Sequence, residues 1–115
     1  MSDFQELTKK IIEFRDARDW KQFHNPKDCA ISLSLEASEL LEHFQWKSEE
    51  QIAELLKNKK EEVADELADV LYWVLLMSHD LNIDLVETSL KKLEKNIAKY
   101  PVEKAKGSNK KYTEL

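Results

Sequence analysis

The sequence is poor in the residues that interrupt helices. Its 115 residues include one glycine and two prolines. Because these two residue types are the strongest breaks in regular structure, a chain with so few of them is expected to be mostly helical. Charged residues make up 36% and hydrophobic residues 42% of the chain. This balance favours amphipathic helices over disorder, and the length corresponds to one domain.

Cysteine and long apolar runs are also scarce. Cys29 is the single cysteine, so no intrachain disulfide can form and a reducing compartment is expected. The longest uncharged apolar run, residues 70–77, is far too short to span a bilayer. The N-terminal residues lack the apolar core of a signal peptide. We therefore expect a cytoplasmic protein that does not bind membranes.

Negative charge dominates the chain but not its C-terminal end. The net charge is −5, whereas residues 91–115 contain eight lysines and three glutamates. The first ninety residues therefore carry a net charge of −10, which argues against nucleic-acid binding. The basic end is either a solvated tail or part of a site for an anion, and composition alone does not distinguish the two.

Capping signals and hydrophobic periodicity predict five helices. Ser2 with Gln5 and Ser48 with Gln51 have the spacing of capping boxes. Asn25 followed by proline is typical of a helix start, and we expect two further caps at Asn58 and Asn82. The predicted helices cover about residues 3–19, 26–46, 49–57, 59–81 and 83–99. This pattern predicts an all-α fold, a four-helix bundle with a short extra helix over residues 1–100, followed by a basic C-terminal tail over residues 101–115.

One predicted helix is apolar on all sides over residues 70–77. Such a helix is buried on most sides in the folded protein, and one domain of this length can scarcely enclose it. We therefore expect an oligomer, either a homodimer or a homotetramer, with this helix in the subunit interface.

Two pairs of acidic residues each share a helix face. Glu36 and Glu39 are three residues apart in one predicted helix, and Glu66 and Asp69 repeat this spacing in another. Both pairs border the apolar face of their helix, so they meet if the two helices pack through these faces. Converging carboxylates repel one another unless a cation neutralises them. Sites made only of oxygen ligands select Mg²⁺, Mn²⁺ or Ca²⁺.

Other interpretations of the acidic pairs remain open. Each pair alone is more typical of a solvated helix face. A di-iron centre would require Glu-x-x-His pairs and a zinc site a cluster of cysteine and histidine, and the sequence contains neither. A non-catalytic helical oligomerisation or interaction module is the alternative of a different class. It accounts for the apolar helix but leaves the acidic pairs unexplained.

Five sequence blocks point to a known family. They are RDWKQFHNPKD, LEASELLEHFQW, DELADVLYWV, KNIAKYP and KKYTEL. From about Arg18 to the C-terminus, the chain resembles the MazG-like all-α nucleotide pyrophosphohydrolases, and most of all their dCTP pyrophosphatase branch. The resemblance implies hydrolysis of nucleoside triphosphates to a monophosphate and pyrophosphate, as nucleotide-pool house-cleaning. It assigns binding of Mg²⁺, for which Mn²⁺ can substitute, to the catalytic residues Glu36, Glu39, Glu66 and Asp69.

The resemblance also implies which residues bind the substrate. Trp20 and Trp46 match positions that hold the base, and the full set is Trp20, His24, Trp46, Trp73, Asn96, Tyr100, Lys111 and Tyr112. Lysines of the tail, including Lys104 and Lys111, could cover the terminal phosphates. By contrast, His43 and His79 match no functional position and are expected to be structural.

The chain departs from the family pattern at two positions. Leu35 stands where MazG proteins often have the first glutamate of their motif, which points to the subfamily more than to the activity. Trp73 stands where a tyrosine is usual, four residues after Asp69. This exchange removes a hydroxyl group and enlarges the stacking surface, so the preferred base and sugar stay open.

Overall fold

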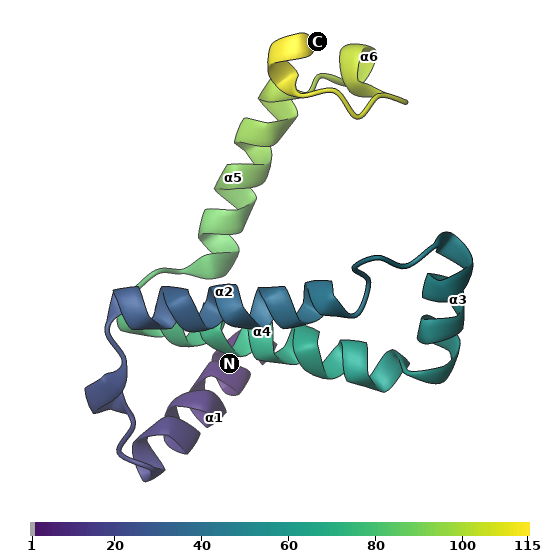
Figure 1. Ribbon diagram of the computed structural model, residues 1–115. Coiled ribbons are helices and arrows are strands. Elements are labelled where there is room, and N and C mark those ends of the chain that lie inside the picture. The colour runs from purple at the N-terminus through teal and green to yellow at the C-terminus, as the bar shows by residue number, and fades with distance from the viewer. Residues whose placement is uncertain (1) are drawn as a thin grey trace. The chain divides into compact units, whose positions relative to one another are not determined.

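The computed structural model of the protein describes residues 2–115, and this part of the chain is helical without any strand (Figure 1). The all-α prediction is therefore confirmed. The helices are α1 (Asp3–Ala17), α2 (Pro26–Glu42), α3 (Glu49–Asn58), α4 (Lys60–Asp80), α5 (Leu85–Lys99) and α6 (Val102–Ala105), with short 3₁₀ turns at Lys21–Phe23 and Tyr112–Glu114. Over residues 2–115, none of these helices is both long enough and apolar enough to cross a membrane.

The chain forms two compact units, Met1–Leu81 and Asn82–Leu115. In the first unit, α2 and α4 lie antiparallel along each other, and α1 and α3 also pack on α4 (Figure 1). The second unit contains α5, α6 and the C-terminal turn. Because the fourth long helix, α5, belongs to the second unit, the four-helix bundle stays a prediction.

Side-chain caps fix the starts of three helices as the sequence predicted. The Ser2 hydroxyl accepts a hydrogen bond from the Gln5 N–H at 3.2 Å, and the Gln5 side chain accepts one from the Ser2 N–H at 2.9 Å. Ser48 and Gln51 form the same reciprocal pair at the start of α3. Asn25 caps α2, ahead of a proline in its first turn.

Two predicted caps were wrong. Asn58 is the last residue of α3, and its side-chain amide donates to Glu54 at 2.9 Å instead of capping α4. Asn82 has a positive φ of 54°, a conformation that asparagine tolerates well, and it turns the chain before α5. Asp84 caps α5 by accepting from the Glu87 N–H at 3.0 Å.

The first two long helices end earlier than predicted. α1 ends at Ala17 and α2 at Glu42, whereas the sequence predicted ends near Asp19 and Trp46. Asp19 and Trp46 both have positive φ, 55° and 66°, which is incompatible with a right-handed helix. The two turns that result lie close to predicted substrate-binding residues.

The core of the first unit lies between α1, α2 and α4. Its buried apolar side chains are Ile11, Cys29, Val63, Leu75 and Leu76. Within residues 70–77, only Leu75 and Leu76 are fully buried, and the other six residues keep part of their surface exposed. A single chain therefore does not cover this helix on all sides.

A partly buried ion pair joins α1 to the C-terminal end of α4. The Arg15 side chain is 1% exposed, and its Nη1 atom donates to Asp80 Oδ2 at 2.7 Å. His79 Nδ1 lies 3.2 Å from the other oxygen of Asp80. Burial opposes the charge of Asp80, but Arg15 and then His79 outweigh it and lower the pKa of this carboxyl.

Candidate functional site

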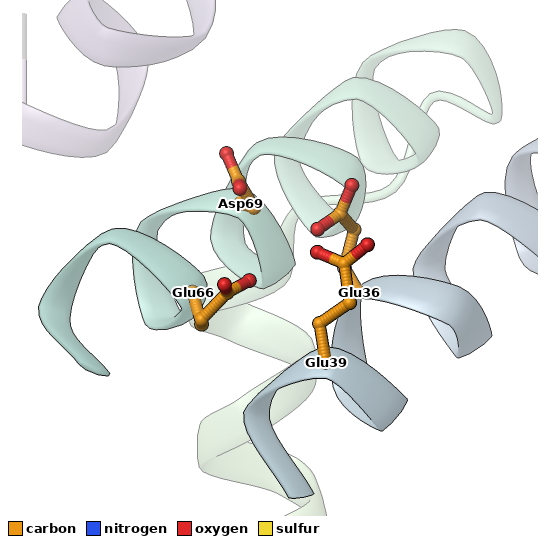
Figure 2. A group of neighbouring side chains, drawn as sticks. All are labelled: Glu36, Glu39, Glu66 and Asp69. Atoms are coloured by element: carbon orange, nitrogen blue, oxygen red, sulfur yellow. The ribbon is translucent and has the colours of Figure 1, made fainter. Parts of the chain in front are cut away.

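The packing of α2 against α4 brings the two acidic pairs together. Figure 2 shows Glu36 and Glu39 of α2 and Glu66 and Asp69 of α4 reaching into the space between these helices. One carboxylate oxygen from each of the four residues lies within 4.8 Å of the others. The predicted meeting of the two pairs is therefore observed.

The environment of this cluster opposes its negative charge. Glu36 and Glu66 are half-buried, whereas Glu39 and Asp69 are exposed. Burial, followed by the neighbouring carboxylates, raises the pKa of Glu36 to about 7. Burial and then Glu39 also raise the pKa of Glu66, against the influence of His43.

Two oxygen atoms of the cluster lack a hydrogen-bond partner. Glu36 Oε2 and Glu66 Oε2 are both buried and find no partner among residues 2–115. Buried polar groups are nearly always satisfied, and an exception calls for an explanation such as a bound ion. The two unsatisfied atoms belong to different helices, so one ligand between α2 and α4 would give both oxygens a partner.

The four residues fit a hard divalent cation. They offer only carboxylate oxygens, which is the donor set of Mg²⁺, Mn²⁺ and Ca²⁺. Opposite ligands of an octahedral Mg²⁺ ion are about 4.2 Å apart, because each Mg–O bond is about 2.1 Å. The 4.8 Å spread of the oxygens is close to that value, so small side-chain rotations would allow them to bind one ion.

A cleft of about 630 Å³ opens beside the cluster. It is lined by α2, α3 and α4 and includes Glu39 and Glu66 of the cluster. Its charged residues are five glutamates and two lysines: Glu39, Glu42, Glu54, Glu62, Glu66, Lys47 and Lys59. Because this lining is mainly negative, it would repel a polyphosphate unless cations accompanied it.

The structure places His43 at the cluster, which the sequence analysis did not expect. His43 lines the same cleft, and its Nε2 atom lies 3.6 Å from Glu66 Oε1. A sequence signal was available, because Glu36, Glu39 and His43 are spaced by three and four residues and therefore share one helix face. His79, by contrast, contacts Asp80, in agreement with the structural role expected for it.

Three predicted substrate-binding residues belong to a chain of aromatic contacts in the first unit. The Trp73 ring packs edge-to-face on His24, with centroids 5.2 Å apart, and on Tyr72 at 5.1 Å. Phe14 links Tyr72 to Trp20 through two further edge-to-face contacts, at 6.2 and 5.6 Å. The sequence analysis did not assign Phe14 or Tyr72 to the site, and no local spacing links Phe14 to the residues of α4.

The remaining predicted substrate-binding residues lie elsewhere. Trp46 follows α2, and 92% of its surface is exposed. The other four, Asn96, Tyr100, Lys111 and Tyr112, lie in the second unit. There the rings of Tyr100 and Tyr112 pack edge-to-face at 6.1 Å, and the Lys99 ammonium lies 4.8 Å from the Tyr112 centroid. Their role in substrate binding stays a prediction.

Comparisons with known proteins agree on one family. The model of the MazG-like family matches residues 31–115. The protein dCTP pyrophosphatase 1 of Rattus norvegicus is 35% identical over 113 residues, which cover 96% of this chain. Its Homo sapiens counterpart is 34% identical with the same coverage. The chain spans 66% of the length of each of these relatives, just under two thirds.

A solved structure is also similar. The crystal structure of a pyrophosphatase from Archaeoglobus fulgidus is 42% identical, with a TM-score of 0.82 over 88% of this chain and 94% of that chain. Together, these comparisons confirm the family resemblance that the five sequence blocks indicated.

Proposed function

The chain belongs to the MazG-like family, and on that premise we propose that it hydrolyses nucleoside triphosphates to a monophosphate and pyrophosphate. The observation that carries the proposal is the cluster of four carboxylates between α2 and α4, with one oxygen of each within 4.8 Å of the others. The relatives support it, because two are dCTP pyrophosphatases and one is a pyrophosphatase. The biological role that we propose is nucleotide-pool house-cleaning in the cytoplasm.

The proposed cofactor is Mg²⁺, with Mn²⁺ as a substitute, held by Glu36, Glu39, Glu66 and Asp69. A bound ion of this kind neutralises phosphate charge and makes water a better nucleophile near neutral pH. The contribution of the protein is to hold four carboxylates in register on two packed helices. Two of their oxygens are buried and have no hydrogen-bond partner in residues 2–115, so this part of the chain leaves the negative charge of the cluster uncompensated.

Hydrolysis by water needs no covalent intermediate with the protein. The water oxygen bonds to the α-phosphorus while the bond between the α-phosphorus and the bridging oxygen breaks. Pyrophosphate leaves with that oxygen, and a carboxylate of the cluster takes the proton of the water. A thiol nucleophile is unsuitable, because burial raises the pKa of Cys29 and an inert thiol is typical of such a setting.

For the base, we propose a pyrimidine, and cytosine in deoxynucleotides most of all. Trp20, His24, Trp46 and Trp73 are the proposed contacts in the first unit. Stacking on aromatic rings contributes roughly 1–3 kcal/mol per base but discriminates poorly between bases. A narrow pocket between indoles would provide the discrimination by excluding purines. In the second unit, Asn96, Tyr100, Lys111 and Tyr112 remain proposed contacts because of the KNIAKYP and KKYTEL blocks.

We further propose that the protein is a homodimer or homotetramer. Apolar surface that the chain leaves exposed supports this. In α4, six of the residues 70–77 keep part of their surface exposed. In α5, Val86, Leu90, Leu93 and Ile97 follow one helix face, and each is about half exposed or more. Sedimentation at micromolar concentration should give the mass of two or four chains, whereas the mass of one chain would contradict this.

The test of the activity is a panel of canonical deoxynucleoside and nucleoside triphosphates with Mg²⁺, the products separated by ion exchange. We expect dCMP and pyrophosphate as the main products from dCTP, and loss of both when EDTA removes the metal. Orthophosphate with dCDP as the first products would contradict the proposed reaction. Equal hydrolysis of dATP, dGTP and dCTP would contradict only the proposed pyrimidine pocket.

A further inference from the structure

His43 contacts the carboxylate cluster from the side of the cleft. It is the C-cap residue of α2, one helical turn after Glu39, and its side chain is 20% exposed. Its Nε2 atom lies 3.6 Å from Glu66 Oε1, across the packing of α2 on α4. The separation is slightly longer than a hydrogen bond, and a small rotation of either side chain would close it.

The two oxygens of Glu66 have different surroundings. Oε1 faces the imidazole of His43, whereas Oε2 is buried with no hydrogen-bond partner in the described residues. A carboxylate with one oxygen held by the protein and the other free is the arrangement expected of a metal ligand with an outer partner. Such outer partners fix the orientation of the ligand and strengthen metal binding.

Among the described residues 2–115, no other basic side chain contacts the cluster. The remaining ion pairs are Arg15 with Asp16 and Asp80, His79 with Asp80, and Lys91 with Glu87, all away from the cluster. Lys47 and Lys59 line the cleft but form no ion pair with any of the four carboxylates. Within residues 2–115, the imidazole is thus the single basic group that is placed to orient Glu66.

We propose that His43 is a positioning residue, which holds Glu66 Oε1 so that Glu66 Oε2 faces the cation. This role rests on the proposed metal site. An imidazole can donate from Nε2 in its neutral Nε2–H form as well as in its charged form. The carboxylate can therefore be held without a full positive charge beside the cation.

The test measures Mg²⁺ affinity by calorimetry, without nucleotide, on the wild-type protein and three variants. His43→Leu removes the donor, and we expect it to weaken Mg²⁺ binding by about 10- to 100-fold, the usual effect of losing an outer partner. His43→Gln retains an N–H donor and should restore most of the affinity. As a control, His79→Leu removes the histidine of α4 that contacts Asp80 and should leave Mg²⁺ binding unchanged.

A kinetic measurement separates positioning from general structural damage. In His43→Leu, the Mg²⁺ concentration for half-maximal turnover should rise, while the KM for the nucleotide at saturating Mg²⁺ stays near that of the wild type. Should His43→Leu not fold, as judged by circular dichroism, His43→Ala takes its place in both measurements.

The outcomes distinguish this inference from the function on which it rests. If the wild type binds Mg²⁺ and the donor-free variants bind it equally well, His43 does not position Glu66, and the proposed function is unaffected. If the wild type binds no divalent cation, the proposed metal site itself is wrong. An equal loss of affinity in His43→Gln and His43→Leu would also overturn the positioning role.

Discussion

Partly buried carboxylates lie at both ends of α4, but only the one at the C-terminal end has a strong cationic partner in the described chain. At the C-terminal end, Asp80 has a cation from the same chain, because Arg15 donates to it at 2.7 Å, and its pKa is lowered although burial opposes the charge. Nearer the N-terminal end, Glu66 and Asp69 meet Glu36 and Glu39, and burial together with the neighbouring carboxylates raises the pKa of Glu36 to about 7.

This difference distinguishes the ion pair of Arg15 with Asp80, which is structural, from the carboxylate cluster, which is a candidate ligand site. A charge that the fold neutralises by itself stabilises a packing arrangement and needs nothing more. A cluster that the fold leaves without a counter-ion needs one from outside, and hard oxygen ligands on two facing helices select divalent cations.

Neutral amide substitutions in the cluster should abolish catalysis without loss of the fold. We expect Glu39→Gln, Glu66→Gln and Asp69→Asn each to reduce turnover by orders of magnitude, since each removes a proposed metal ligand. Metal-free stability should hold or improve, because each change relieves like-charge repulsion. Steady-state kinetics and thermal unfolding would measure the two effects.

A matched control lies next to the cluster. Asp65 precedes Glu66 on α4 and is exposed outside the cluster, so Asp65→Asn should keep normal turnover. Near-normal activity in two or more of the cluster variants would refute the assignment of these carboxylates.

At the other end of α4, breaking the ion pair should affect stability and not chemistry. Arg15→Met leaves the Asp80 carboxylate without its main partner. Removal of one member of a buried pair costs roughly 3–5 kcal/mol of unfolding free energy. The contact of His79 with Asp80 and the 22% exposure of the Asp80 side chain place the expected loss at or below the lower limit of that range. Urea denaturation would measure it.

The double variant Arg15→Met with Asp80→Leu should recover most of the stability, because it removes both charges together. Turnover per folded molecule should stay close to that of the wild type in both variants. A selective loss of kcat in stable protein would show that the two ends of α4 are not independent.

The pH dependence of stability should also differ between the two ends. Glu36 titrates near 4.5 when unfolded and near 7 in the fold, so the folded protein binds more protons between these values. Its metal-free stability should therefore fall as pH rises from about 4.5 to 7. The lowered pKa of Asp80 has the opposite sign, and its contribution is lost only in acid, below the usual value of 3.8.

Thermal unfolding in EDTA at several pH values would measure how the metal-free stability changes with pH. The lowered pKa of His24 adds a smaller rise with pH, which is removed by comparing the wild type with Glu36→Gln. We expect the fall in stability to be smaller in the variant, in which the raised pKa of Glu66 remains, and Mg²⁺ to reverse the fall in the wild type at pH 7.5. A shift of roughly 4–8 °C corresponds to each kcal/mol in a small domain. Identical slopes in the two proteins would contradict a raised pKa at Glu36.

Local sequence signals predicted much of the fold and the centre of the site. Capping boxes at Ser2 and Ser48 depend on residues three positions apart, so they were predictable without tertiary structure. The acidic pairs were predictable for the same reason, since a spacing of three residues fixes a shared helix face. The predictions of caps at Asn58 and Asn82 were wrong because asparagine favours turns and helix ends as well as N-caps. Only the path of the chain decides which of these conformations it adopts.

Other features depended on contacts between distant segments. Local spacing places His43 on the helix face of Glu36 and Glu39, but its proximity to Glu66 depends on the register of α2 against α4, which local spacing does not specify. The same is true of the aromatic chain from Trp20 through Phe14 and Tyr72 to Trp73, which joins α1, its following turn and α4. Trp46 has a left-handed backbone conformation, which an aromatic residue rarely adopts, so the sequence predicted neither this turn nor the exposure of the side chain.

Trp46 is an apolar side chain that the fold leaves exposed, and its substitution is expected to have the smallest effect on activity. Like the carboxylate cluster, its indole has no adequate partner in the chain, since 92% of its surface is exposed. If that surface stacks on a nucleotide base, Trp46→Ala should raise KM by about tenfold, because 1.4 kcal/mol of binding is a factor of ten. Unfolding free energy should change little, as the side chain buries almost nothing in the folded chain. Trp46→Phe retains an aromatic face and should recover much of the affinity. An unchanged KM together with a shift in sedimentation mass would instead assign the indole to a subunit interface, and base stacking would then have to come from Trp20 and Trp73.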